Sequence, residues 1–183
     1  MPTTTKVSAG KPKVAGAVYR APLGTALPTD ASTSLSSAFV DMGYISEDGV
    51  TNSNSPDTEK IKAWGGQVVL IVSTEKPDTF QLTFLESLNA SVLETVYGAN
   101  NVTVSGNVIT VLANAKELGE FVYVIDVAMR GGAMKRIVIP DGALSELGDI
   151  VYKDDEAIGY EVTLDCMPDA SGNSHYEYIQ MAT

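Results

Sequence analysis

The sequence is poor in the residue types on which catalysis and metal binding depend. Its 183 residues include one cysteine, Cys166, and one histidine, His175. A single cysteine excludes a disulfide framework within one chain, and an isolated histidine lacks the companions of a metal cluster or a catalytic triad. Neither Gly65-Gly66 nor Gly131-Gly132 belongs to a phosphate-binding motif. We therefore expect no metal, no cofactor and no enzymatic activity.

Positive charge and long hydrophobic runs are also scarce. The chain has 12 Lys and Arg against 23 Asp and Glu, a formal net charge of −11 at pH 7. Surfaces that bind nucleic acid or anionic membranes need clustered cations, so this balance argues against both partners. No apolar run approaches the ~20 residues that span a bilayer, and residues 1–13 lack the apolar segment of a secretory signal. We expect a chain that is made in a cytoplasm and has no membrane partner.

Strand periodicity is the main pattern that the sequence does contain. Hydrophobic residues make up 44 % of the chain, which is enough for a globular core. Between residues 119 and 167, apolar and polar side chains alternate with a period of two, the signature of strands with two different faces. Turn signals at Gly131-Gly132, Asp141-Gly142 and residues 153–155 divide this segment into an antiparallel meander. The sequence predicts a mainly β fold, a β-sandwich or split barrel, with one flanking helix over residues 87–97.

Three shorter segments carry signals of their own. The helix is predicted from an apolar stripe, with Asn89 or Ser87 as its N-cap and Gly98 after its last residue. Residues 67–74 form a continuous β-branched and aliphatic run, which predicts a strand that is covered on both faces. Residues 105–107 are typical of the tight turn of a small hairpin.

The ends of the chain and one internal segment are polar. Residues 1–13 are predicted to form an N-terminal arm, residues 14–173 a single β domain, and residues 174–183 a C-terminal strand or arm. Residues 47–58 are turn-prone and too many for a tight hairpin, so they are predicted to form a long loop. Such arms and open strand edges are typical of a protein that assembles, because unpaired edges are liabilities unless a neighbour pairs with them. Copies arranged in a ring would complete the sheet into a large barrel with a polar lumen.

Three segments of the sequence resemble one protein family, in the same order along nearly the whole chain. They are DMGYISEDGV at residues 41–50, TEKIKAWGG at residues 58–66, and the segment from IVIPDGAL to SHYEYI at residues 137–179. The most telling pieces are Gly148-Asp149-Ile150, residues 152–160 and Glu177-Tyr178. In these segments the chain resembles the major tail tube proteins of long, non-contractile-tailed bacteriophages, notably those of actinobacterial hosts. The resemblance implies a virion protein of the phage tail that is assembled in the host cytoplasm.

The resemblance also implies an architecture and a set of partners. Subunits of that family are β-sandwiches with a flanking helix, and they form helically stacked hexameric rings around a tape-measure protein, with other tail proteins as further partners. Their inner strands join into one β-barrel channel, through which DNA passes without specific binding. A long loop or arm contacts the next ring. The residues expected in that loop are Glu47, Asp48, Asn52, Asn54 and Asp57.

The acidic balance of the chain suggests how DNA would pass through the expected channel. Acidic side chains on a luminal face repel phosphates, so that DNA develops no affinity through counterion release. The luminal candidates are Glu120, Asp126, Glu161 and Asp165, and the same four residues fit an outer solvated face equally well. The candidates for contacts between subunits are Trp64, Arg130, Lys135 and Arg136, with a sugar-stacking platform as the alternative for Trp64.

Two other functions are compatible with the same pattern. A β-sandwich module that binds a cell-surface sugar or protein would be a stable monomer with a ligand groove. A particle protein similar to a tail terminator would cap a tube rather than extend it.

Overall fold

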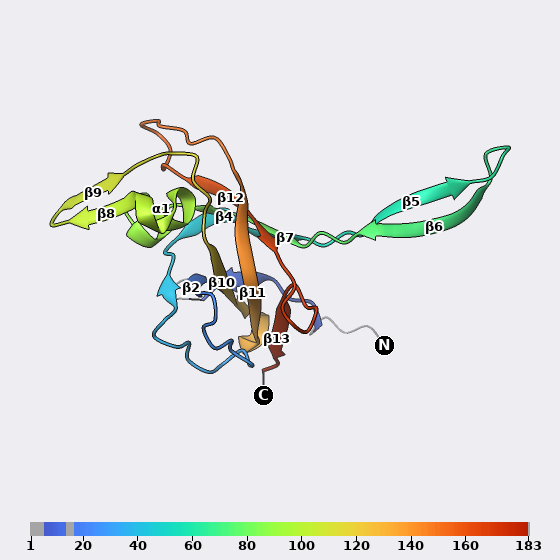
Figure 1. Ribbon diagram of the computed structural model, residues 1–183. Helices are drawn as coiled ribbons and strands as arrows, with labels where there is room; N and C mark the ends of the chain where they lie inside the picture. Colours follow the sequence, from blue (N-terminus) through green and yellow to red (C-terminus); the bar gives the residue numbers. More distant parts are fainter. Residues whose placement is uncertain (1–5, 14–16, 183) are drawn as a thin grey trace.

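The fold is built on two long antiparallel strands at its centre (Figure 1). The computed structural model describes residues 6–13 and 17–182. β10 (Glu120–Met129) and β11 (Met134–Leu147) form the middle of a nine-stranded antiparallel sheet. The order across it is β3 (Val40–Asp41), β2 (Val18–Pro22), β10, β11, β12 (Tyr160–Cys166), β7 (Thr79–Phe84) and β4 (Ile45–Ser53), with β1 (Gly10–Pro12) beside β10 and β13 (Tyr176–Gln180) beside β11. The prediction of a mainly β fold with a flanking helix is confirmed.

The predicted meander is confirmed in its order, but not in all its turns. β10, β11 and β12 are antiparallel neighbours, and the 3-10 turn Arg130–Gly132 joins the first two. The predicted turn at Asp141-Gly142 is wrong, because both residues lie within β11. A Cβ at Gly142 would lie 2.8 Å from the ring of Tyr123 on β10. This glycine therefore makes room for the ring of Tyr123 within the sheet instead of reversing the chain.

The main core cluster lies on one side of the sheet, and on the other side Val122, Val124 and Val138 of β10 and β11 are buried as well. Along β12 and β7, buried apolar side chains alternate with more exposed polar ones, as the period of two predicted. Burial of each large side chain of this kind contributes about 1.5–3 kcal/mol. The buried series consists of Phe80, Leu82, Phe84, Tyr160, Val162, Leu164 and Cys166.

The helix α1 (Ala90–Tyr97) packs on this core and is followed by the 3-10 turn Ala99–Asn101. It begins at Ala90 and not at residue 87, because the side chain of Asn89 accepts a hydrogen bond from the backbone N–H of Ser91 at 3.0 Å and caps the first turn. The buried side chains of the apolar stripe of α1 are Val92, Leu93 and Val96.

No helix among the described residues is long and apolar enough to cross a membrane.

Two hairpins extend from the body of the molecule (Figure 1). β5 (Asp57–Lys62) and β6 (Val68–Glu75) form the longer one, which is inserted between β4 and β7. β8 (Val102–Ser105) and β9 (Val108–Val111) form the other, so the predicted turn at residues 105–107 is confirmed. The predicted long loop at residues 47–58 is wrong, because residues 47–53 belong to β4 and β5 begins at Asp57. The predicted cover over residues 67–74 is wrong too, because all of β6 is exposed and the described residues supply no layer over it.

Both ends of the chain contribute strands to the central sheet. β1 pairs with the end of β10, so that part of the predicted N-terminal arm belongs to the sheet. β13 pairs with the first half of β11, which confirms the predicted C-terminal strand. Residues 1–5 and residue 183 of the two predicted arms lie outside the described residues.

Candidate assembly surfaces

The side of the sheet opposite the core carries exposed polar residues. Glu161 and Asp165 are exposed on β12, on either side of the half-buried Thr163. Their direct cross-strand partners on β7 are Thr83, Thr79 and Gln81. Partners that lie opposite each other in a sheet point to the same face. Carboxylates and small polar side chains therefore stand together on a sheet whose other face is packed.

This polar face continues across β11 to β10. Asp165 pairs with Ala143, and Ala143 pairs with Glu120, so the three residues form one row across the sheet. The predicted luminal acids Glu120, Glu161 and Asp165 thus share one exposed face. Glu146, the partner of Thr163, adds a fourth carboxylate. Sequence reasoning missed Glu146 because the supposed turn at residues 141–142 interrupted the strand pattern before it. The polar face thus consists of these four carboxylates together with Thr79, Gln81, Thr83 and Thr163.

Hydrogen bonds hold two of these carboxylates in place. Nε2 of Gln81 donates to Oε1 of Glu161 at 2.7 Å, and Oγ of Ser145 donates to Oδ1 of Asp165 at 2.7 Å. β7, β12 and residues 139–147 contain no Lys or Arg. No cation on these strands offsets the negative charge of the carboxylates.

Asp126 lies on β10 but is not part of the polar face. It is 4 % exposed, and its Oδ1 and Oδ2 accept hydrogen bonds from Nε and Nη2 of Arg136 at 2.6 and 2.9 Å. Nη1 of Arg136 donates to the carbonyl oxygens of Asp30 and Thr33 at 3.1 and 2.8 Å, so a loop of residues 23–39 covers the pair. The prediction of Asp126 as an exposed luminal acid is wrong for this reason. The prediction of Arg136 as a contact for a neighbouring subunit is wrong as well, because its guanidinium is enclosed within the chain.

The two remaining basic candidates differ in their surroundings. Nζ of Lys135 lies 2.5 Å from Oε1 of Glu177 on β13, so it pairs within the chain. Arg130 is exposed in the turn between β10 and β11, where its backbone N–H donates to Oγ of Ser8 at 2.8 Å. A contact of Arg130 with another subunit stays a prediction.

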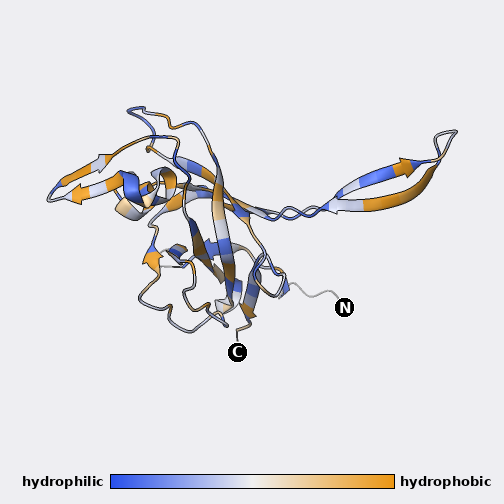
Figure 2. Ribbon diagram, viewed as in Figure 1, coloured by the Kyte–Doolittle hydropathy of each residue, from blue (hydrophilic) through white to orange (hydrophobic). Residues whose placement is uncertain are grey.

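The hairpin of β5 and β6 is a second exposed surface, of opposite character (Figure 2). Val69, Leu70 and Ile71 of β6 are 60 %, 53 % and 57 % exposed, and Ile61 on β5 is the direct partner of Leu70. Because neighbouring residues of a strand point to opposite faces, β6 is apolar on both sides of the hairpin, whereas β5 is mostly polar (Figure 2). A two-stranded hairpin has marginal stability on its own, and contiguous exposed apolar side chains mark interaction sites.

The residues predicted for a loop between rings lie along the route into this hairpin. Glu47 and Asp48 are exposed in β4, and Nδ2 of Asn52 donates to Oδ1 of Asp78 at 2.8 Å. Asn54 is half-buried at the base of the hairpin, and Asp57 is the first residue of β5. The predicted set therefore marks a strand and the hairpin base, and it omitted the hairpin itself.

The groups that could support catalysis are held in structural contacts. Burial, with Asp78 and Asp165 nearby, raises the pKa of the Cys166 thiol to about 12, so the thiol is protonated at neutral pH. Nδ1 of His175 contacts Oδ2 of Asp78, and its ring packs edge-on against Phe80, which anchors the start of the C-terminal segment. Within the described part of the chain, no group of three or more His, Cys, Asp or Glu side chains could hold a metal ion.

Comparison with known proteins adds an independent observation. The family model described as phage tail tube protein matches residues 11–183 of the chain. No curated protein matches the sequence. The matched range contains the polar face, the hairpin of β5 and β6, and the core that supports both.

Proposed function

Because the chain belongs to the phage tail tube protein family, we propose that it polymerises into stacked hexameric rings that form an acidic-lined conduit for DNA. The chain is a structural component of the phage tail and assembles into a multimeric tube with other tail proteins. The observation that carries the proposed conduit is the polar face, which exposes four carboxylates, while β7, β12 and residues 139–147 contain no Lys or Arg. These carboxylates belong to Glu120, Glu146, Glu161 and Asp165.

Ring closure gives the polar face its place in the assembly. β3 and β4 are the outermost strands in the order of the central sheet. Exposed strand edges pair readily with another chain, and closure of a sheet on itself removes them. In the proposed ring, neighbouring subunits join their sheets edge to edge, with the polar faces toward the lumen and the packed cores outside. The lumen encloses a tape-measure protein during assembly and conducts DNA afterwards.

The charge of the lumen allows DNA to slide. A wall with clustered cations would release counterions from the phosphates and hold the DNA, with an affinity that falls steeply as salt rises. A wall of carboxylates lacks this attraction, and its field keeps the phosphates near the axis. The proposed role is therefore passive conduction, and it requires no catalytic step by this chain.

The hairpin of β5 and β6 takes over the role that was predicted for a loop at residues 47–58. Trp64 at its tip stands up to roughly 35 Å from Ser53 at the end of β4, at about 3.3 Å per strand residue. A segment of this reach, with one strand that is apolar on both faces, is suited to contact subunits beyond its own, including those of the next ring.

Electron microscopy of the purified full-length protein at high concentration tests the proposal. We expect tubes of indefinite length with an open channel, and at high resolution Glu161 and Asp165 at the channel wall. A protein that stays monomeric would contradict tube formation and favour a binding module. Rings that do not extend would instead indicate a terminator. Tubes whose channel is lined by another face would overturn the acidic lumen alone.

A further inference from the structure

The only tryptophan of the chain stands at the tip of the hairpin of β5 and β6. The side chain of Trp64 is fully exposed, at 107 % of the reference value. Its turn is ordered, because Ala63 and Gln67 are joined by a backbone hydrogen bond of 2.8 Å and Gly66 donates to Ala63 at 2.9 Å. Tryptophan buries about 150–250 Å² in a contact and is enriched among the residues that dominate interface energies. The indole of Trp64, held out into solvent by this turn, is therefore suited to insert into a preformed hollow on another surface.

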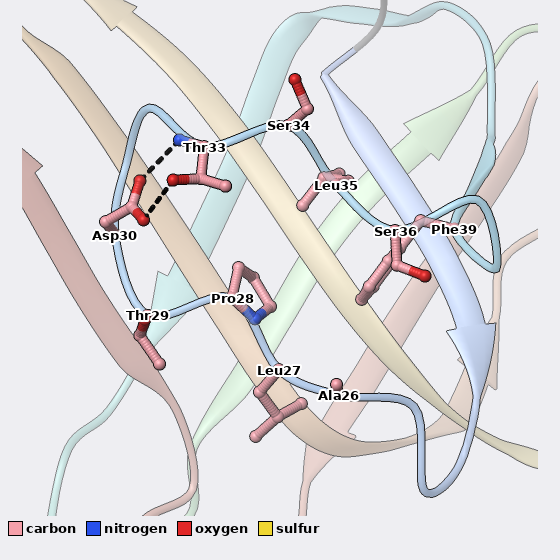
Figure 3. A pocket seen from close by; sticks show the side chains of 10 residues that line it. All are labelled: Ala26, Leu27, Pro28, Thr29, Asp30, Thr33, Ser34, Leu35, Ser36 and Phe39. Atoms are coloured by element: carbon pink, nitrogen blue, oxygen red, sulfur yellow. Dashed lines mark hydrogen bonds between the residues drawn. The ribbon is translucent and has the colours of Figure 1, made fainter.

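Such a hollow lies in the loop of residues 23–39 (Figure 3). It is a cavity of about 220 Å³, open to solvent on one side, whose apolar lining is half-buried. A water molecule takes about 30 Å³ in the liquid, so the cavity accepts a much larger group. The apolar side chains around it are Leu27, Pro28, Leu35 and Phe39.

The loop that forms the hollow is fixed to the sheet. The carboxylate of Asp30 accepts hydrogen bonds from the backbone N–H groups of Ser32 and Thr33 at 2.7 and 2.6 Å, which closes a tight turn at the rim. The guanidinium of Arg136, on β11 of the sheet, donates hydrogen bonds to two backbone carbonyl oxygens of the same turn. The hollow therefore exists before any partner arrives, and a ligand does not have to order it.

The tip and the hollow cannot meet within one molecule. The hairpin projects from one side of the body, and the loop between β2 and β3 lies on the opposite side (Figure 1). A contact between them must join two copies through different surfaces, a head-to-tail arrangement that generates rings or open filaments. The occupant that the structure offers for the hollow is thus a second copy of the chain.

The charges on the two surfaces are complementary. Lys60 and Lys62 are exposed beside the tip, and residues 60–68 contain no Asp or Glu. Asp30 is the one charged residue among residues 23–39, and it stands at the rim of the hollow. In a chain with a net charge of −11, a basic tip and an acidic rim favour this pairing over contacts with most of the surface.

We infer that Trp64 of one subunit inserts into the hollow between Leu27, Pro28, Leu35 and Phe39 of another subunit. The inference rests on the proposed polymerisation and names one contact that holds it together. An interface of standard size buries about 1,200–2,000 Å², so the indole is the anchor and the exposed aliphatic side chains of β6 supply further area.

Tryptophan fluorescence tests the contact, because Trp64 is the sole source of indole emission. On assembly of the unmodified chain, we expect a shift of the emission to shorter wavelength and a loss of acrylamide quenching. Leu27→Gln and Leu35→Gln make the hollow polar and should abolish that shift, whether or not tubes still form. Leu88→Gln, at an exposed position outside both surfaces, is the matched control and should retain it. An unchanged shift in both hollow variants would overturn the inference.

Cross-linking provides a second measurement that does not depend on fluorescence. Chains with Trp64→Cys and chains with Leu35→Cys are mixed, allowed to assemble and treated with a short bismaleimide. We expect linked dimers in the mixture only, because the native Cys166 is buried and protonated. Absence of dimers in mixtures that form tubes would also overturn the contact. If the unmodified chain forms no tubes, the proposed polymerisation itself fails, and this outcome is distinct from loss of the contact within tubes.

Discussion

At the scale of single residues, the pair of Asp126 and Arg136 shows how one contact can connect distant segments. The pair joins β10 to β11, and the same guanidinium holds the backbone of the loop over residues 23–39. Nζ of Lys13 adds a third charge, 3.4 Å from Oδ2 of Asp126. The sheet, the N-terminal segment and the wall of the hollow are thus coupled through one buried carboxylate.

Arg136→Ala should reduce the free energy of unfolding by about 3–5 kcal/mol, because it leaves the buried carboxylate of Asp126 without its main partner. It also deprives the loop of two hydrogen bonds. Chemical denaturation measures the change, with Arg130→Ala as a matched loss of an exposed arginine that should shift stability by less than about 0.5 kcal/mol. Equal stabilities of the two variants would contradict the assigned role.

Asp30 should remain ionised in acid that protonates ordinary aspartates. Hydrogen bonds from the hydroxyl and the backbone N–H of Thr33, and then from Ser32, hold the pKa of Asp30 well below its usual range. The sign follows from the lowered pKa: the stabilising contribution is present above the unfolded value of about 3.9 and is lost only as pH falls through the folded pKa. NMR titration of the carboxyl group measures the pKa of Asp30. A pKa near the ordinary value of an aspartate would show that the hydrogen bonds of the turn do not stabilise the carboxylate.

At the scale of elements, the sequence predicts one strand of the hairpin of β5 and β6, but it does not predict that this strand is exposed. The run at residues 67–74 correctly predicted a strand, but its two apolar faces predicted a cover that the described part of the chain does not supply. The sequence could not show that the chain leaves this strand uncovered, because the same pattern arises whether the cover comes from the same molecule or from another. The polar residues of β5 did not indicate a projecting hairpin, because lysines and a glutamate occur on any exposed strand.

Removal of the hairpin should abolish assembly and leave the domain folded. Replacement of residues 56–76 by a short glycine and serine turn keeps the pairing of Ser53 with Thr79 at the base and removes no buried side chain of the core. We expect the circular dichroism spectrum of a folded β domain and no tubes in electron micrographs. Tubes of normal appearance from this variant would show that the hairpin is dispensable.

At the scale of the whole molecule, the alternation on β7 and β12 predicted which side of the sheet is packed and which acids share the other side. Glu161 and Asp165 could be placed because each strand keeps an unbroken period of two and its neighbours are similar. Asp126 could not, because a loop from the other end of the chain covers the end of the same sheet. Exposure at a given strand position depends on such distant segments, which a local pattern does not contain.

Reversal of charge on the polar face should convert assembled tubes into a DNA-binding surface. The double substitution Glu161→Lys and Asp165→Lys places cations where the proposed lumen is acidic, so DNA binding should appear and weaken as salt rises. Asp154→Lys with Asp155→Lys is the matched control, because both residues are exposed in the connection between β11 and β12 and do not belong to the strands of the polar face. Binding measured by DNA retention in sedimented tubes should differ between the two, and equal retention would argue against a luminal polar face.

The insertion point of the hairpin has an evolutionary consequence. β4 and β7 pair at Ser53 and Thr79, so the two ends of the insertion are held side by side by the domain itself. A longer or shorter insertion there changes only the entropy of closing a loop, at about 0.6 kcal/mol for each doubling of length. Natural selection can therefore lengthen, shorten or exchange the hairpin without redesigning the core, and in the proposed assembly the spacing between subunits would vary independently of the fold.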